Sequence, residues 1–269
     1  MRLAFFRGFG LTLVLIAGST AAFASDAAAP QAPARKPVKQ RPDPAVPLMY
    51  VGCKSYDYPG RHAAILKLKN GIDPQIVFIG DSITHHWGGE PASRLRDGEK
   101  VLKSDLGAYR TLNLGFGHDR TQHALWRLQN GEIDGINPDW VVIHIGTNNL
   151  SDGHTAAEVM SGIRAICDEV RKRTPKAKVV LMSVFPRERQ PTHGRRKVVA
   201  ELNRLISAYA EQQKFINIDL TAQFVPADGV IPPALMPDAL HLSAEGYRIW
   251  AKALLEVFQK QASGKRLGP

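Results

Sequence analysis

The stretch IVFIGDS, residues 76–82, decides the fold of this chain. A short apolar run ends there in a glycine, an aspartate and a serine. Similar apolar runs lie at 110–114, 140–145, 178–185 and 215–218, with helical patterns between them. Continuous apolar strands of this kind are typical of parallel sheets that are covered on both faces. The alternation predicts a three-layer α/β/α domain built on a doubly wound, five-stranded parallel sheet.

The helical patterns carry their own start and stop signals. Thr155 and Glu158 form a capping box, which opens a helix that must end before Pro175. Apolar residues from 198 to 209 recur at helical spacing and predict one buried helix face. Ser243 can cap a last helix that runs to about Gln261.

The composition excludes several classes of protein. The chain has 269 residues, of which 44% are apolar and 22% charged, so it can bury a sizeable core and is not collagen-like, coiled-coil or wholly disordered. Lys and Arg number 35 and Asp and Glu 25, which gives a net charge of +10. That balance favours acidic surfaces. The charges are dispersed, however, so no nucleic-acid partner is expected. The oligomeric state stays open.

The first 24 residues have the order of a signal peptide. Arg2 and Arg7 are followed by an apolar run at 11–17 and by a small-x-small cleavage site at 22–24. The apolar run is too short to span a membrane, and no cysteine near the cut could take a lipid anchor. We therefore expect an exported protein, periplasmic or secreted, whose mature chain starts near Ser25.

The remaining chain divides by composition. Residues 25–47 are rich in Ala and Pro and predict an extended, flexible linker. Residues 48–262 carry the strand and helix patterns and form the expected domain. Residues 263–269 predict a flexible tail.

The cysteines and several histidines are assigned structural roles. Export permits a bridge between Cys53 and Cys167, but two cysteines do not make a disulfide framework. Cys167 lies in a helical pattern and is expected to be a small buried residue. No Cys/His spacing resembles a metal site, and His85 and His86 are interpreted as a polar rim. His144, inside an apolar strand, is interpreted as a core histidine with its hydrogen bonds made.

Small or polar residues follow three of the predicted strands. The segments are Gly-Asp-Ser-Ile-Thr at 80–84, Asn-Leu-Gly-Phe-Gly-His-Asp at 113–119 and Gly-Thr-Asn-Asn at 146–149. Far downstream, Pro-Asp-Ala-Leu-His at 237–241 precedes the last helix. In a doubly wound sheet these four segments can meet at one edge.

Together these segments contain the parts of a serine esterase. Ser82 at a strand-to-helix turn presents a hydroxyl, which needs a base such as His241 to become a nucleophile. Asp238 can accept from the other ring nitrogen of that histidine. The Ser82 N–H, a backbone N–H of the second segment and the Asn148 amide can stabilise an oxyanion. Each segment alone could be a capped turn. The set, in this order, favours catalysis.

The chain resembles the SGNH hydrolases, also called the GDSL esterase/lipase family, and within it the group around the α subunits of platelet-activating-factor acetylhydrolase. The segments 113–131, 185–187 and 238–247 carry the likeness, which covers roughly residues 76–257. It implies the flavodoxin-like SGNH hydrolase fold, with Ser82 as nucleophile, Asp238 and His241 as its partners and Asn148 as an oxyanion donor. One departure is that a family glycine, itself an oxyanion donor, falls on His118.

The expected function is hydrolysis of a carboxylic ester, with a short acyl group such as acetyl on a glycan or lipid. The reaction would pass through an acyl-enzyme on Ser82 without a cofactor or metal. The alternative is a non-catalytic carbohydrate-binding or scaffolding protein on the same fold. A nucleotide-binding protein would need a phosphate loop, whereas the first turn offers Asp81 and no glycine-rich cradle.

Overall fold

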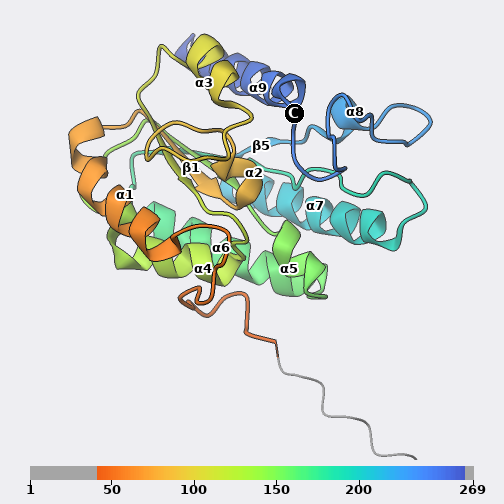
Figure 1. Cartoon of the computed structure of the whole chain (residues 1–269), viewed down its shortest axis with the longest axis horizontal. Coiled ribbons are helices and arrows are strands. Elements are labelled where there is room, and N and C mark those ends of the chain that lie inside the picture. The colour runs from red at the N-terminus through yellow and green to blue at the C-terminus, as the bar shows by residue number, and fades with distance from the viewer. Residues whose placement is uncertain (1–40, 264–269) are drawn as a thin grey trace, which may run out of the picture. The chain divides into compact units, whose positions relative to one another are not determined.

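The computed structural model describes residues 41–263 (Figure 1). The predicted signal peptide, the first part of the predicted linker and the tail from residue 264 lie outside the described residues. Five parallel strands form one sheet in the order β2-β1-β3-β4-β5. They are β1 Ile76–Gly80, β2 Thr111–Gly115, β3 Trp140–His144, β4 Lys178–Met182 and β5 Ile216–Ile218. The predicted doubly wound parallel sheet is confirmed.

The strand register brings the polar segments to one edge of the sheet. Gly80, the last residue of β1, pairs with Gly115 of β2 and with His144 of β3. The adjacent strands β2, β1 and β3 therefore end level with one another, so the loops that follow them leave the sheet side by side.

Helices cover both faces of the sheet (Figure 1). One core contains residues of α1 Tyr58–Ile72, α4 Thr121–Arg127, η1 Leu128–Glu132, α5 Thr147–Ser151, α6 Ala156–Arg173 and α7 Gly194–Gln213. The other contains residues of α2 Ser82–His85, α3 Glu99–Asp105, α8 Thr221–Phe224 and α9 Ala244–Ala262. None of the helices between residues 41 and 263 has the length and apolar character that a membrane crossing requires.

The predicted capping residues cap their helices in the structure. The Glu158 N–H donates to Thr155 Oγ1 at 3.2 Å and the Thr155 N–H to Glu158 Oε2 at 2.7 Å, and α6 ends before Pro175. Ser243 caps α9 by accepting from the Gly246 N–H at 3.2 Å. Cys167 is fully buried on α6, and burial raises the pKa of its thiol to about 12. It and Cys53 are free thiols, so the bridge that the sequence left open is absent between them.

The packed unit includes residues 41–47, which were predicted to belong to the linker. Arg41 donates to the Gly153 carbonyl, and the Thr121 hydroxyl donates to the Pro44 carbonyl at 2.9 Å. Pro44 itself is buried. The predicted domain start at Leu48 is therefore too late. An Ala/Pro-rich segment shows no apolar periodicity, yet its carbonyl oxygens can still accept hydrogen bonds from a neighbouring helix.

Candidate active site

Ser82 lies at the sharp turn between β1 and α2. A Cβ on Gly80 would lie 2.0 Å from Thr84 Oγ1 and 2.4 Å from the His144 carbonyl oxygen, so only glycine fits there. Asp81 caps α2 by accepting from the Ile83 N–H at 3.0 Å. Complete burial raises the pKa of Asp81 to about 7, although that hydrogen bond opposes the shift. This turn presents the Ser82 side chain, which is half-buried, at the carboxyl edge of the sheet.

The structure joins Ser82, His241 and Asp238 in one chain of hydrogen bonds. Ser82 Oγ lies 2.9 Å from His241 Nε2, and His241 Nδ1 lies 2.7 Å from Asp238 Oδ2. The other Asp238 oxygen accepts from the backbone N–H of His241 at 2.7 Å. Burial would raise the pKa of Asp238, but its hydrogen bonds to His241 outweigh that effect and hold the pKa below its ordinary value. The aspartate is therefore ionised at neutral pH, and the histidine can accept the serine proton.

The turn that carries this aspartate is braced by the segment after β4. The Glu188 N–H donates to the Ala239 carbonyl at 3.0 Å. The guanidinium of Arg189 donates through Nη2 to the Pro237 carbonyl and through Nη1 to the Ile231 carbonyl, both at 2.8 Å. Arg189 was not predicted from the sequence, because a lone arginine beside a predicted strand carries no signal of its partners.

The predicted oxyanion donors come from the loops after β2 and β3. His118 has a left-handed backbone, with a φ of 68°, and its ring hydrogen-bonds to Ser55 Oγ at 2.8 Å. Asn148, in the first turn of α5, donates from its side-chain amide to the Asp119 carbonyl at 2.8 Å. Among the described residues, no acceptor takes the backbone N–H of Ser82 or of His118. An N–H without an intramolecular acceptor can donate to an oxyanion, which is the role that the sequence predicts for both groups.

A buried ion cluster anchors the loop after β2. Asp119 accepts from the Tyr58 hydroxyl at 2.8 Å and pairs with Arg127 at 2.7 Å, and Arg127 also pairs with Glu132. The side chains of Asp119, Arg127 and Glu132 are all 0% exposed. Burial raises the pKa of Asp119 to about 6, against the attraction of Arg127. Because the Asp119 carbonyl also holds Asn148, the cluster fixes the loop and the amide together.

The prediction that His85 belongs to a polar rim is wrong. Its side chain is buried, and its Nδ1 accepts the Gly117 N–H at 3.2 Å. Burial lowers the pKa of His85 to about 2, so the ring is neutral and acts as a support for the loop after β2. The sequence could not show this contact, because a histidine beside a polar turn is as compatible with exposure as with burial.

His144 is a core histidine, as predicted. It is buried in β3, accepts the Phe185 N–H at 3.3 Å through Nε2 and packs against the Phe185 ring. Burial lowers its pKa to about 3. Its Nδ1 has no partner among the described residues, so the prediction that its hydrogen bonds are made is wrong for one of the two ring nitrogens. Within residues 41–263, no three His, Cys, Asp or Glu side chains are grouped as metal ligands.

A cavity of about 540 Å³ adjoins the loop after β2. Its wall includes Ser55, which contacts His118, and Tyr56, whose hydroxyl donates to the Gly117 carbonyl at 3.1 Å. His85 and the segment 91–95 complete much of the wall. None of Ser82, Asp238 and His241 lines this cavity, but Ser55 and Tyr56 of its wall contact the loop after β2 directly.

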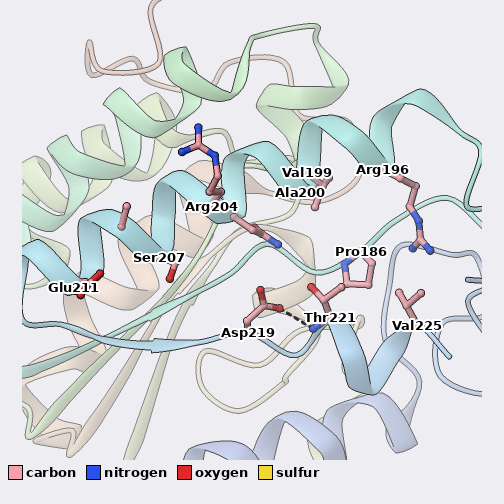
Figure 2. Close-up of a pocket in the computed structure, with 12 residues that line it drawn as sticks. Pro186, Arg196, Val199, Ala200, Arg204, Ser207, Glu211, Asp219, Thr221 and Val225 are labelled. Carbon is pink, nitrogen blue, oxygen red and sulfur yellow. Dashed lines mark hydrogen bonds between the residues drawn. The ribbon is translucent and has the colours of Figure 1, made fainter. Parts of the chain in front are cut away.

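A second cavity, of about 610 Å³, lies between α7 and the segment after β5 (Figure 2). Asp219 accepts the Thr221 N–H there at 2.8 Å and so closes the turn into α8. None of Ser82, Asp238 or His241 lines this cavity. The cavity is distinct from the candidate active site.

Residues 78–249 match the model of the GDSL-like lipase/acylhydrolase family. The chain belongs to this family. Among its curated relatives, human platelet-activating factor acetylhydrolase IB subunit alpha1 is 39% identical over 183 residues, which cover 68% of this chain and 74% of that protein. Subunit alpha2 from Rattus norvegicus is 33% identical over 189 residues, covering 70% and 77%. As a GDSL-like acylhydrolase, the protein is a carboxylic ester hydrolase.

Solved structures of this family share its fold. A GDSL-like lipase from Bacteroides thetaiotaomicron superimposes with a TM-score of 0.57 at 22% identity, over 74% of this chain and 99% of that one. An acetylxylan esterase from Geobacillus stearothermophilus gives a TM-score of 0.56 at 24% identity, over 68% and 93%. The GDSL-like fold expected from the sequence is confirmed.

Proposed function

We propose that this protein is an exported esterase that removes acetyl or other short acyl groups from a glycan or lipid through an acyl-enzyme on Ser82. The observation that carries the proposal is the hydrogen-bonded chain from Ser82 to His241, 2.9 Å, and from His241 to Asp238, 2.7 Å. A serine needs such a base to attack an ester. A scaffolding protein has no need of this geometry.

The geometry supports the following mechanism. His241 Nε2 takes the Ser82 proton while Oγ attacks the ester carbonyl. The oxyanion accepts hydrogen bonds from the Ser82 and His118 N–H groups and from Asn148. The intermediate expels the alcohol, which receives its proton from His241. Water then attacks the acyl-enzyme as His241 takes its proton. The second intermediate releases the carboxylic acid as His241 returns the proton to Ser82 Oγ.

The relatives favour an acetyl group. Platelet-activating factor acetylhydrolase subunits and an acetylxylan esterase are named for acetyl esters, of a lipid and of a glycan respectively. The 540 Å³ cavity beside the loop after β2 favours a polar alcohol, because Ser55, Asp57, Ser93 and Arg94 belong to its wall and an alcohol that extends past His118 toward Ser55 would meet them. Sugar hydroxyls can both donate to and accept from such groups. A glycan ester is therefore the favoured substrate, and residues 1–24 favour export to the periplasm or the medium.

Ser82→Ala tests the mechanism. We expect the turnover of acetyl esters to fall by about 10⁴-fold or more, because the serine, histidine and aspartate act as a unit. Ser161→Ala on α6 is the matched control, since its hydroxyl only donates to the Glu158 carbonyl. Wild-type activity in the Ser82 variant would disprove the proposal.

The substrate class needs a separate assay. Wild-type protein is compared on acetyl, butyryl and octanoyl esters of one alcohol, and on acetylated xylo-oligosaccharides and an acetylated phospholipid analogue. We expect the ratio kcat/KM to fall as the acyl chain lengthens and to be higher for the oligosaccharide. A preference for octanoyl esters or for the lipid would contradict the acetyl or the glycan assignment respectively.

A further inference from the structure

A second histidine–aspartate pair lies against the first. The Nδ1–H of His86 donates to Asp97 Oδ2 at 2.8 Å, as that of His241 donates to Asp238 Oδ2 at 2.7 Å. The rings of His86 and His241 are stacked, with centroids 4.9 Å apart and planes inclined by 11°. The face of the His86 ring is therefore parallel to the ring that bonds Ser82.

His86 is held at its backbone and at its ring, and it is the less exposed of the two histidines. Its N–H donates to the Ser82 carbonyl at 2.9 Å, and its own carbonyl accepts the Gly98 N–H at 2.9 Å. The side chain of His86 is 9% exposed, whereas that of His241 is 27% exposed and belongs to a surface turn. With Asp97 bonded to its ring, His86 is fixed at both backbone and side chain. A fixed ring can limit the rotation of a more exposed one.

We propose that His86 is a positioning residue for His241. Its ring face confines the His241 imidazole to the plane in which Nε2 meets Ser82 and Nδ1 meets Asp238. The ring face supplies this confinement, and the bond to Asp97 only adds to the backbone bonds that already hold His86. This inference rests on the proposed function of Ser82, because His241 needs a fixed plane only if it transfers a proton.

The His86 ring stays uncharged beside His241. Burial and the neighbouring His241 lower the pKa of His86, against the opposing effects of Asp97 and Asp238. The ring of His85, a further neighbour at 6.5 Å, is neutral as well. When His241 takes the serine proton, it therefore faces a neutral aromatic ring instead of a second cation, and such a face attracts a cation.

Two substitutions separate the ring from its polar atoms. His86→Phe keeps a flat ring and loses the bond to Asp97, whereas His86→Gln keeps a polar group and loses the ring. We expect kcat on an acetyl ester to fall about 10- to 100-fold in His86→Gln and in His86→Ala, with KM within about twofold, because a misplaced base slows the chemical step. His86→Phe should retain kcat within about threefold. Thermal unfolding of each variant checks that the fold persists.

Two results would overturn the proposed role of His86. A His86→Phe variant as slow as His86→Gln would show that the polar atoms matter and overturn the proposal. Unchanged kcat in His86→Gln would do the same. Failure of the proposed function is recognised separately, because it appears as activity in Ser82→Ala whatever the His86 variants do.

Discussion

The oxyanion loop, residues 116–119, and the histidine turn, residues 237–241, meet at one site but are held in opposite ways. The loop is anchored to the core by the buried side chains of Asp119, Arg127 and Glu132, each of which is 0% exposed. The turn is anchored by backbone carbonyls that bond to Glu188 and Arg189, and its Asp238 side chain is 55% exposed. The loop is therefore held by ion pairs that are buried away from solvent. The turn is held by hydrogen bonds at the surface of the protein.

This difference follows from what each region does in the proposed mechanism. Oxyanion donors help most when they are fixed before the substrate arrives, since no energy is then spent on reorienting them. The histidine must instead pass a proton between serine, alcohol and water, so it has to lie at an accessible surface. Damage to the loop should therefore affect folding as well as rate, and damage to the turn should affect rate alone.

Among the variants that compare the two regions, Asp238→Asn should give the largest effect on rate, although a smaller one than Ser82→Ala, and it tests the turn. An asparagine amide can favour the wrong tautomer of His241, so we expect kcat to fall by about 10³- to 10⁴-fold. Because the aspartate is half exposed and bonds mainly to its own turn, stability should barely change. Paired measurements of kcat and thermal midpoint check this. A loss of stability that accounts for the lost activity would show that the turn, too, is a structural anchor.

Arg127→Met tests the loop. Removal of the arginine leaves Asp119 and Glu132 buried without a cation, and breaking such a pair costs about 3–5 kcal/mol of unfolding free energy. Arg173→Met is the matched control, because Arg173 also pairs with two carboxylates, Asp134 and Glu169, but its side chain is 21% exposed. Surface pairs contribute about 1 kcal/mol or less. Urea titration of both variants measures the difference.

Equal costs in the two arginine variants would show that the buried cluster anchors the loop no more strongly than an exposed ion pair holds the end of α6. If Arg127→Met does not fold, Glu132→Gln keeps the test open, because it leaves Asp119 paired with Arg127. That variant should be less stable than the wild type by a smaller amount. A Glu132→Gln protein with wild-type stability would contradict an anchoring role for the cluster.

The two regions also differ in how far the sequence could predict them. The strands followed from local patterns, and Ser82, Asp238 and His241 followed from the order of the turns after those strands, although each turn alone could be structural. The partners of Arg127 did not, since charged residues are usually exposed and nothing local marks three of them as a buried set. His85 was misassigned for the same reason. The burial of Arg127 and of His85 depends on packing between segments that are far apart in the sequence. The spacing of neighbouring residues does not reveal such packing.

His118→Gly should give the smallest effect and sharpens the comparison, because His118 belongs to the anchored loop but its side chain lies at the surface. The proposed donor is the backbone N–H, which glycine also supplies, and glycine adopts a φ of 68° without strain. We therefore expect kcat on acetyl esters to stay within about threefold.

Loss of the His118 ring releases Ser55, which lines the neighbouring 540 Å³ cavity, so the preference among alcohol groups should shift. Ser55→Ala breaks the same contact from the other side and should shift that preference in the same direction. Assays of both variants with several acetyl esters provide the measurement. An unchanged preference in both would show that the His118 ring plays no part in choosing the substrate, and a large fall in kcat for the glycine variant would show that the loop depends on its surface as well as on its buried anchor.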